Sequence, residues 1–293
     1  MESSDGINGI IFGGYSTSGA IYNNKIIIGE GVNTSLISIL GGRSTSGDIY
    51  NNTITVNSND INITGNISGG QSDSGKVYNN TINIHGGNIN SVGGADVDTG
   101  ESYGNVINIY GGKIGNVYGG VSSNGTSHDE TVNIFGGTIT AIWGGDYNST
   151  VNFSSGNFTG SMIRGSRYGY GGTVNITGGT LAGSIFGTRH DTGNAYNNTV
   201  NISNATYNVD DNGIFGALGA NAYNNVVNIY SGNFSTVSHP GLIIGGAIMD
   251  NGVAHDNTVN IEGGTFSGNI VAGSGNSNSE IYNNVLNIKA KNV

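Results

Sequence analysis

A four-residue pattern that recurs along the whole chain constrains its fold more than any other feature. In its most regular form it reads Thr-Val/Ile-Asn-Ile, and eleven copies occur at spacings of 19 to 32 residues. The regular copies begin at Thr81, Thr131, Thr173, Thr199 and Thr258. The looser copies occupy 25–28, 53–56, 106–109, 150–153, 226–229 and 285–288. Such periodic self-similarity predicts a stacked array of one structural unit.

Alternation inside each copy predicts a β-strand with one buried face. The second and fourth positions are apolar in all eleven copies, whereas the first and third are mostly Thr, Val and Asn. Successive side chains of a strand point to opposite faces, so the apolar set shares one face. Two more short apolar segments usually follow a Gly-Gly corner, as in Thr138-Ile139 and Ile142-Trp143. One unit cannot bury its apolar face alone, but stacked units can.

We therefore predict an all-β fold, a right-handed single-stranded parallel β-helix (β-solenoid). It should contain about eleven rungs of roughly 25 residues, with three short strands in each rung. Residues 1–293 are expected to form a single solenoid domain, as a fragment of a longer repeat array. An antiparallel sandwich is the alternative, but its neighbouring strands would need different residue plans and hairpin turns.

Composition excludes several classes of function. The chain has no Cys, which removes disulfides, thiolate metal sites and thiol nucleophiles. Its net charge of −10 has the wrong sign for binding nucleic acid or anionic lipid. No apolar run approaches the roughly 18 residues of a membrane span, so we expect no membrane insertion of this segment. The sequence indicates no cofactor.

The corner before the repeat strand predicts a structural ladder. Tyr-Asn-Asn precedes six of the strands, and Asn tolerates the left-handed backbone of tight turns. We expect the amides to bond to turn backbone and to each other, and the tyrosines to stack. The predicted ladder residues are Asn52, Asn80, Asn198, Asn225 and Asn284.

Large side chains next to inward-facing positions predict an outward aromatic column. If Val117, Ile142, Ile185 and Ile214 point inward, their successors point outward. These successors are Tyr118, Trp143, Phe186 and Phe215, the candidate ligand-binding residues, and Arg164 interrupts their column. An exposed apolar stripe is typical of a binding surface and suits sugar rings. Alternatively, the loops cover these side chains.

Acid–base pairs are interpreted as repeat variants, and we assign neither catalytic residues nor metal ligands. His128-Asp129-Glu130 and His255-Asp256-Asn257 stand where other units have Tyr-Asn-Asn. The acidic residues Asp96, Asp98, Glu101 and Asp210-Asp211 lie in loops, and Asp129 lies about one rung from Asp98. Because glycoside hydrolysis needs two placed carboxylates, a glycan-active enzyme, lyase or hydrolase, is the alternative. The Thr-x-Asn face leaves an ice-binding solenoid as another alternative.

Asn-Asn-Thr-Val-Asn-Ile followed by Gly-Gly-Thr-Phe resembles the low-complexity arrays in passenger domains of bacterial autotransporter adhesins. Segments 79–89, 197–204 and 257–270 carry the likeness, which covers essentially the whole chain. The resemblance implies a β-helix exported to the bacterial cell surface, although neither a signal peptide nor a C-terminal membrane barrel is visible. We therefore expect a non-enzymatic, adhesive, extracellular rod. Its expected partners are a host or bacterial surface protein or a glycan, and end-to-end or lateral self-association is a further expectation.

Overall fold

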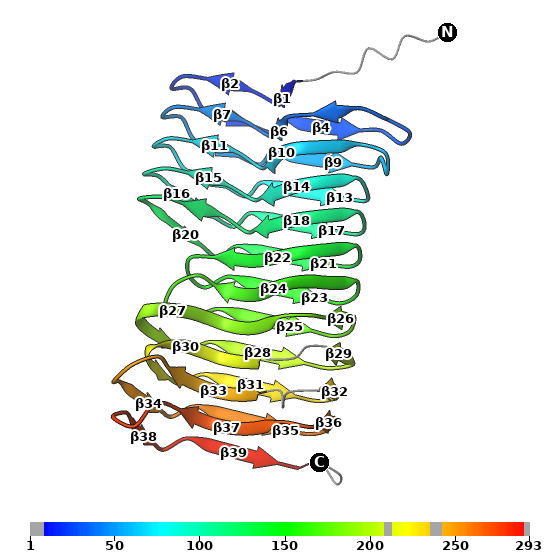
Figure 1. The fold of residues 1–293 in the computed structure, drawn as a ribbon. Helices are drawn as coiled ribbons and strands as arrows, with labels where there is room; N and C mark the ends of the chain where they lie inside the picture. Colours follow the sequence, from blue (N-terminus) through cyan, green and yellow to red (C-terminus); the bar gives the residue numbers. More distant parts are fainter. Residues whose placement is uncertain (1–8, 208–212, 235–241, 290–293) are drawn as a thin grey trace. The chain divides into compact units, whose positions relative to one another are not determined.

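The computed structural model describes residues 9–207, 213–234 and 242–289. Contacts group the chain into two compact units, Met1–Ile139 (unit 1) and Thr140–Val293 (unit 2). The described residues form strands and turns without a helix. Both units are parallel β-solenoids (Figure 1). The described residues of the two units make about 10 turns in total. The predicted fold class is thus confirmed.

The repeated four-residue pattern forms one parallel sheet in each unit. Identical repeat positions pair with each other, as Ile82 does with Ile107. In unit 1 the strands are β4 (Lys25–Ile28), β9 (Thr53–Val56), β13 (Thr81–Ile84), β17 (Val106–Ile109) and β21 (Thr131–Ile134). In unit 2 they are β23 (Thr150–Phe153), β25 (Thr173–Ile176), β28 (Thr199–Ile202), β31 (Val226–Ile229), β35 (Thr258–Ile261) and β39 (Val285–Ile288).

The turns of unit 1 contain more strands than the three predicted. The two apolar segments after the Gly-Gly corner join into one longer strand, and the Ser-x-Ser-Gly loop adds two short strands. The longer strands are β1 (Ile10–Phe12), the pair β5 (Ser35–Leu36) and β6 (Ser38–Leu40), β10 (Asn62–Ser68), β14 (Asn88–Gly93), β18 (Lys113–Tyr118) and β22 (Thr138–Gly145), which ends in unit 2. The first short set is β2 (Tyr15–Ser16), β7 (Arg43–Ser44), β11 (Gln71–Ser72), β15 (Asp96–Val97) and β19 (Val121–Ser122). The second is β3 (Ile21–Tyr22), β8 (Ile49–Tyr50), β12 (Val77–Tyr78), β16 (Glu101–Tyr103) and β20 (Thr126–His128).

Unit 2 keeps three strands in its most regular turns, for example β25, β26 (Thr180–Leu181) and β27 (Ser184–Tyr196). Strands β27 and β30 (Gly213–Tyr223) are long because they run through the positions that form separate short strands in unit 1. The remaining strands are β24 (Asn157–Ser166), β26 (Thr180–Leu181), β27 (Ser184–Tyr196), β29 (Ala205–Tyr207), β30 (Gly213–Tyr223), β32 (Gly232–Phe234), β33 (Leu242–Ile248), β34 (Val253–His255), β36 (Thr265–Phe266), β37 (Asn269–Ser274) and β38 (Glu280–Tyr282).

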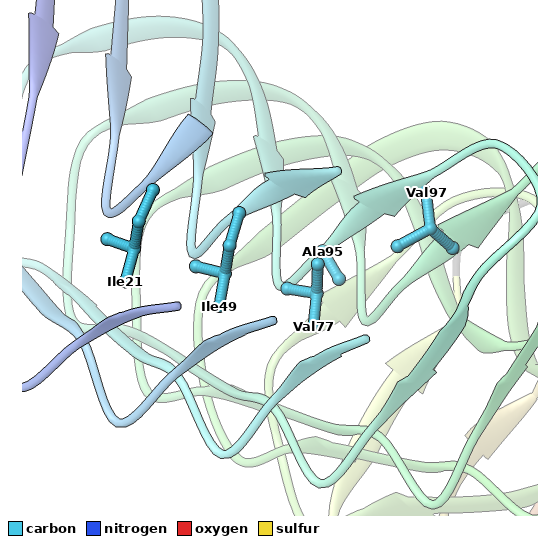
Figure 2. Packing of buried hydrophobic residues seen from close by; sticks show 5 residues of the cluster. All are labelled: Ile21, Ile49, Val77, Ala95 and Val97. Carbon is cyan, nitrogen blue, oxygen red and sulfur yellow. The ribbon is translucent and has the colours of Figure 1, made fainter. Parts of the chain in front are cut away.

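The interior is made of stacked aliphatic side chains, as the alternation predicts. Ile82 and Ile107 are fully buried in successive turns of unit 1. Figure 2 shows a second row, in which Ile21, Ile49 and Val77 follow each other along β3, β8 and β12. Equivalent residues thus form continuous columns, each turn covering the apolar side chains of the next.

The glycines that directly follow the longer strands of unit 1 have a steric cause. A Cβ built on Gly69 would overlap the carbonyl oxygen of Gly94 in the next turn, and one on Gly94 would overlap that of Gly119. These backbones therefore approach too closely for any side chain.

Candidate functional site

The predicted asparagine ladder is present in both units. In unit 1, Asn52 donates from its backbone N (2.9 Å) and its Nδ2 (3.0 Å) to Oδ1 of Asn80. The same two bonds join Asn198 to Asn225, Asn225 to Asn257 and Asn257 to Asn284 in unit 2. The residue before each rung of the ladder is left-handed, with φ of 56° at Asn51 and 55° at Asn79. The corner is therefore a structural element.

Three further asparagines and one glutamate belong to the ladder beside the five predicted residues. Asn24, Asn105 and Asn257 make the same bonds as the predicted members. Asn24 belongs to a Tyr-Asn-Asn corner, and Asn257 and Glu130 belong to the His-Asp variants of that corner. Asn105 follows Tyr-Gly and was missed, although its spacing from the following strand was an available signal.

Glu130 occupies an asparagine position of the ladder in unit 1. It is 1% exposed, and its Oε2 accepts a hydrogen bond from the backbone N of Asn105 (2.7 Å). Its Oε1 accepts hydrogen bonds from Nδ2 of Asn105 (3.2 Å) and from the hydroxyl of Ser102. Burial raises the pKa of Glu130 to about 8, although these hydrogen bonds oppose the shift. Glu130 is thus a buried carboxyl that favours its neutral form.

Tyrosine and histidine rings stack in front of the ladder. Tyr50, Tyr78 and Tyr103 have successive centroid distances of 4.9 and 5.0 Å. His128 continues this column 5.5 Å from Tyr103, and in unit 2 His255 lies between two tyrosines. Both histidines therefore occupy tyrosine positions, as their interpretation as repeat variants requires.

A network of charged side chains surrounds His128. Its Nε2 lies 3.1 Å from Oε1 of Glu101, and its Nδ1 lies 2.8 Å from Oδ2 of Asp129. Lys76 donates to Oε2 of Glu101 (2.8 Å). Hydrogen bonds from Lys76 and His128 lower the pKa of Glu101, and its two carboxylate contacts raise the pKa of His128 against the effect of burial. This electrostatic arrangement holds Glu101 ionised.

The other acidic candidates are not brought together. Asp98 accepts a hydrogen bond from Nδ2 of Asn124 (2.8 Å), and Asp96 accepts one from Nε2 of Gln71 (3.1 Å). Burial raises the pKa of Asp96. Asp210 and Asp211 lie outside the described residues. Within the described ranges, no group of three or more His, Cys, Asp or Glu side chains could hold a metal ion.

The outward face of the repeat strands carries a second feature that the prediction missed. His85, Tyr110 and Phe135 form an exposed stack in unit 1, with centroid distances of 4.6 and 5.0 Å. Beside them, Nδ2 of Asn108 donates to Oδ1 of Asn83 (2.9 Å). Stacking occupies the faces of the inner ring, so the column presents mainly ring edges to solvent. The aromatic residue directly after each of these repeat strands was the sequence signal that could have predicted this stack.

The predicted aromatic column is divided between the units and only partly exposed. Tyr118 is half-buried in unit 1, where it lines a groove of about 150 Å³ with Asp96. Trp143, Phe186 and Phe215 belong to unit 2. Trp143 and Phe215 are half-buried, whereas Phe186 is only 3% exposed and stacks on Phe215 at 4.8 Å. The expected continuous exposed stripe is thus interrupted at Phe186.

Arg164 completes the column in unit 2. It pairs in register with Phe186, and its Cζ lies 5.7 Å from the ring centroid of Trp143. On β27, Cζ of Arg189 lies 6.0 Å from the ring centroid of Phe186. Two guanidinium groups therefore cover two aromatic rings, a favourable cation–π arrangement. We call Trp143, Arg164, Phe186, Arg189 and Phe215 the arginine–aromatic cluster.

No helix in the described ranges is long and apolar enough to cross a membrane. Comparisons with protein-family models, with curated proteins and with solved structures give no significant match.

Proposed function

We propose that the chain is a non-enzymatic scaffold of an adhesive protein on the bacterial cell surface, and that unit 2 binds a partner through the arginine–aromatic cluster. The observation that carries this proposal is the half-buried Arg164 between Trp143 and Phe186, held in register by parallel strands. Side chains placed by a hydrogen-bonded ladder form a preorganised surface, which reduces the entropic cost of binding. The resemblance to autotransporter passenger domains supports the surface location.

The carboxyl groups support binding over hydrolysis. A glycosidase needs a general acid with a raised pKa that reaches the substrate. Glu130 has the raised pKa but is buried in a ladder, and Glu101 is half-buried but has a lowered pKa. Asp96 combines a raised pKa with a place in the groove beside Tyr118, but among the described residues that line this groove it is not joined by a second carboxyl group.

Glycan-array binding of the full chain tests the proposal. We expect specific binding that Trp143→Ala weakens, because this substitution removes the indole beside Arg164. The matched control is Tyr110→Ala, which removes a half-exposed ring from unit 1 and should leave binding unchanged. Incubation of the bound glycans with the protein should release no shorter product. Chain cleavage, or the absence of binding to any glycan or surface protein, would refute the proposed function.

A further inference from the structure

Positive charge is concentrated in one part of an acidic chain. Three of the four arginines, Arg164, Arg167 and Arg189, lie within 26 residues. Between Tyr147 and Val209 the sequence has a single acidic residue, Asp191, whereas the whole chain has a net charge of −10. This part of unit 2 therefore attracts anions, unlike the rest of the chain.

The guanidinium of Arg164 keeps unused hydrogen-bond donors. Its Nε donates to the sulfur of Met162, but neither terminal nitrogen has an acceptor among the described residues. Among the described residues, no carboxylate oxygen lies within 4.0 Å of the guanidinium nitrogens of Arg164. Partial burial and the nearby charge of Arg189 lower the pKa of Arg164. A half-buried cation without an anionic partner is costly, so a bound anion would stabilise it.

Arg189 shows how such an anion can be held. Its Nε and Nη2 donate to the two carboxylate oxygens of Asp191, at 2.7 and 3.4 Å. The hydrogen bonds from Arg189 lower the pKa of Asp191, and the positive charge of Arg164 lowers it further. Asp191 remains half-exposed. It therefore pairs directly with Arg189 and acts on Arg164 only at a distance, so the terminal nitrogens of Arg164 stay available.

We propose that Arg164 binds the carboxylate of a uronic-acid residue, so that the partner of the arginine–aromatic cluster is an acidic glycan; this inference rests on the proposed function. A guanidinium and a carboxylate form two parallel hydrogen bonds. The half-buried indole of Trp143, 5.7 Å from Cζ of Arg164, offers apolar surface to the C–H face of the same sugar. An acidic peptide side chain supplies the carboxylate without that apolar ring.

Calorimetric titration with tetragalacturonate and with its methyl ester tests the inference, because the two share a backbone and differ in charge. The full chain should bind the acid and not the ester, and the affinity should fall as salt is added. Arg164→Gln should weaken binding at least about tenfold, the loss expected for a charged hydrogen-bonded pair. The matched control is Arg43→Gln, which changes the charge equally in unit 1, where Arg43 pairs with Asp73 at 2.7 Å.

Asp191→Asn provides an independent variant that should bind more tightly. It removes a negative charge near the ligand, and a gain in affinity cannot result from misfolding. Equal binding of acid and ester would overturn the uronate assignment but leave a glycan-binding scaffold. Tighter binding of tetraglutamate than of tetragalacturonate would overturn the glycan class. Failure to bind any glycan would overturn this inference, whereas the proposed function fails only if no surface protein is bound either.

Discussion

Glu130 accepts a hydrogen bond from the backbone N of Asn105 at 2.7 Å, at a position where other turns of unit 1 place an asparagine. Asparagine would also donate from its Nδ2 to a carbonyl of the previous turn, as Asn105 does to Val77 (3.1 Å). An ionised glutamate has no donor. The substitution makes one corner of the ladder sensitive to protonation.

The stability of unit 1 should therefore depend on pH through Glu130. Burial raises its pKa from 4.5 to about 8, so the folded state binds this proton more tightly than the unfolded state. The contribution is full below pH 4.5 and is lost as pH rises through about 8. In urea unfolding across this range, wild type should lose about 1.4 kcal/mol per pH unit relative to Glu130→Gln.

The control for this titration is Glu262→Gln, which removes an exposed carboxylate. Its unfolding free energy should follow that of wild type across the pH range. If the unfolding free energies of Glu130→Gln and wild type run parallel across this pH range, the pKa of Glu130 does not differ between the folded and unfolded states, and the prediction fails.

Removing an interior amide of the ladder should destabilise unit 1. Asn80→Ala deprives the backbone N of Asn52 of its acceptor (2.9 Å) and the carbonyl of Ile49 of its donor (3.2 Å). Buried unsatisfied groups cost about 1–3 kcal/mol each, so we expect a loss of about 2–5 kcal/mol in urea unfolding. Asn83→Ala, on the outward face, should cost less than about 1 kcal/mol. Equal losses for both variants would contradict a special role for the corner.

Ring stacking should make a measurable contribution in front of the ladder. Tyr78→Ala removes contacts with Tyr50 and Tyr103, at centroid distances of 4.9 and 5.0 Å. Each aromatic pair contributes about 0.5–1.5 kcal/mol, so thermal unfolding should reveal a loss of about 1–3 kcal/mol. Tyr78→Phe keeps both stacks and should stay near wild type. A loss for the phenylalanine variant as large as that for alanine would assign the effect to the hydroxyl.

The left-handed corner should tolerate glycine and reject branched residues. Asn79 has φ of 55°, a conformation that β-branched side chains rarely adopt. Asn79→Val should therefore lower the unfolding free energy by about 1–2 kcal/mol, whereas Asn79→Gly should change it by less than half as much. Urea unfolding of the two variants measures the difference. Equal stability would show that the corner relaxes into another conformation.

The sequence predicted those features that depend on one turn and repeat in the next. Alternation placed Ile82 and Ile107 in the core, and the Tyr-Asn-Asn motif located Asn80 in its ladder. Both follow from local geometry that parallel stacking then copies. The extra short strands of unit 1 were not visible, because two-residue segments carry too little periodicity.

Burial and contacts that depend on side chains in the neighbouring turns could not be predicted from the sequence. Phe186 is buried although alternation places it outside, because neighbouring side chains cover it. Arg164 was interpreted as an interruption of the column, since only the register with Phe186 shows which groups surround its guanidinium. Glu130 was interpreted as a repeat variant in a turn, and its burial became evident only with the ladder in place.

The interchangeable partners of the asparagine corners have a genetic consequence. If residues 53–80 were deleted from unit 1, Asn52 would meet Asn105 where it now meets Asn80, with the same donors and acceptor. Loss or gain of a whole repeat in the gene can therefore shorten or lengthen such a molecule by whole turns, and every surviving neighbour keeps an equivalent contact.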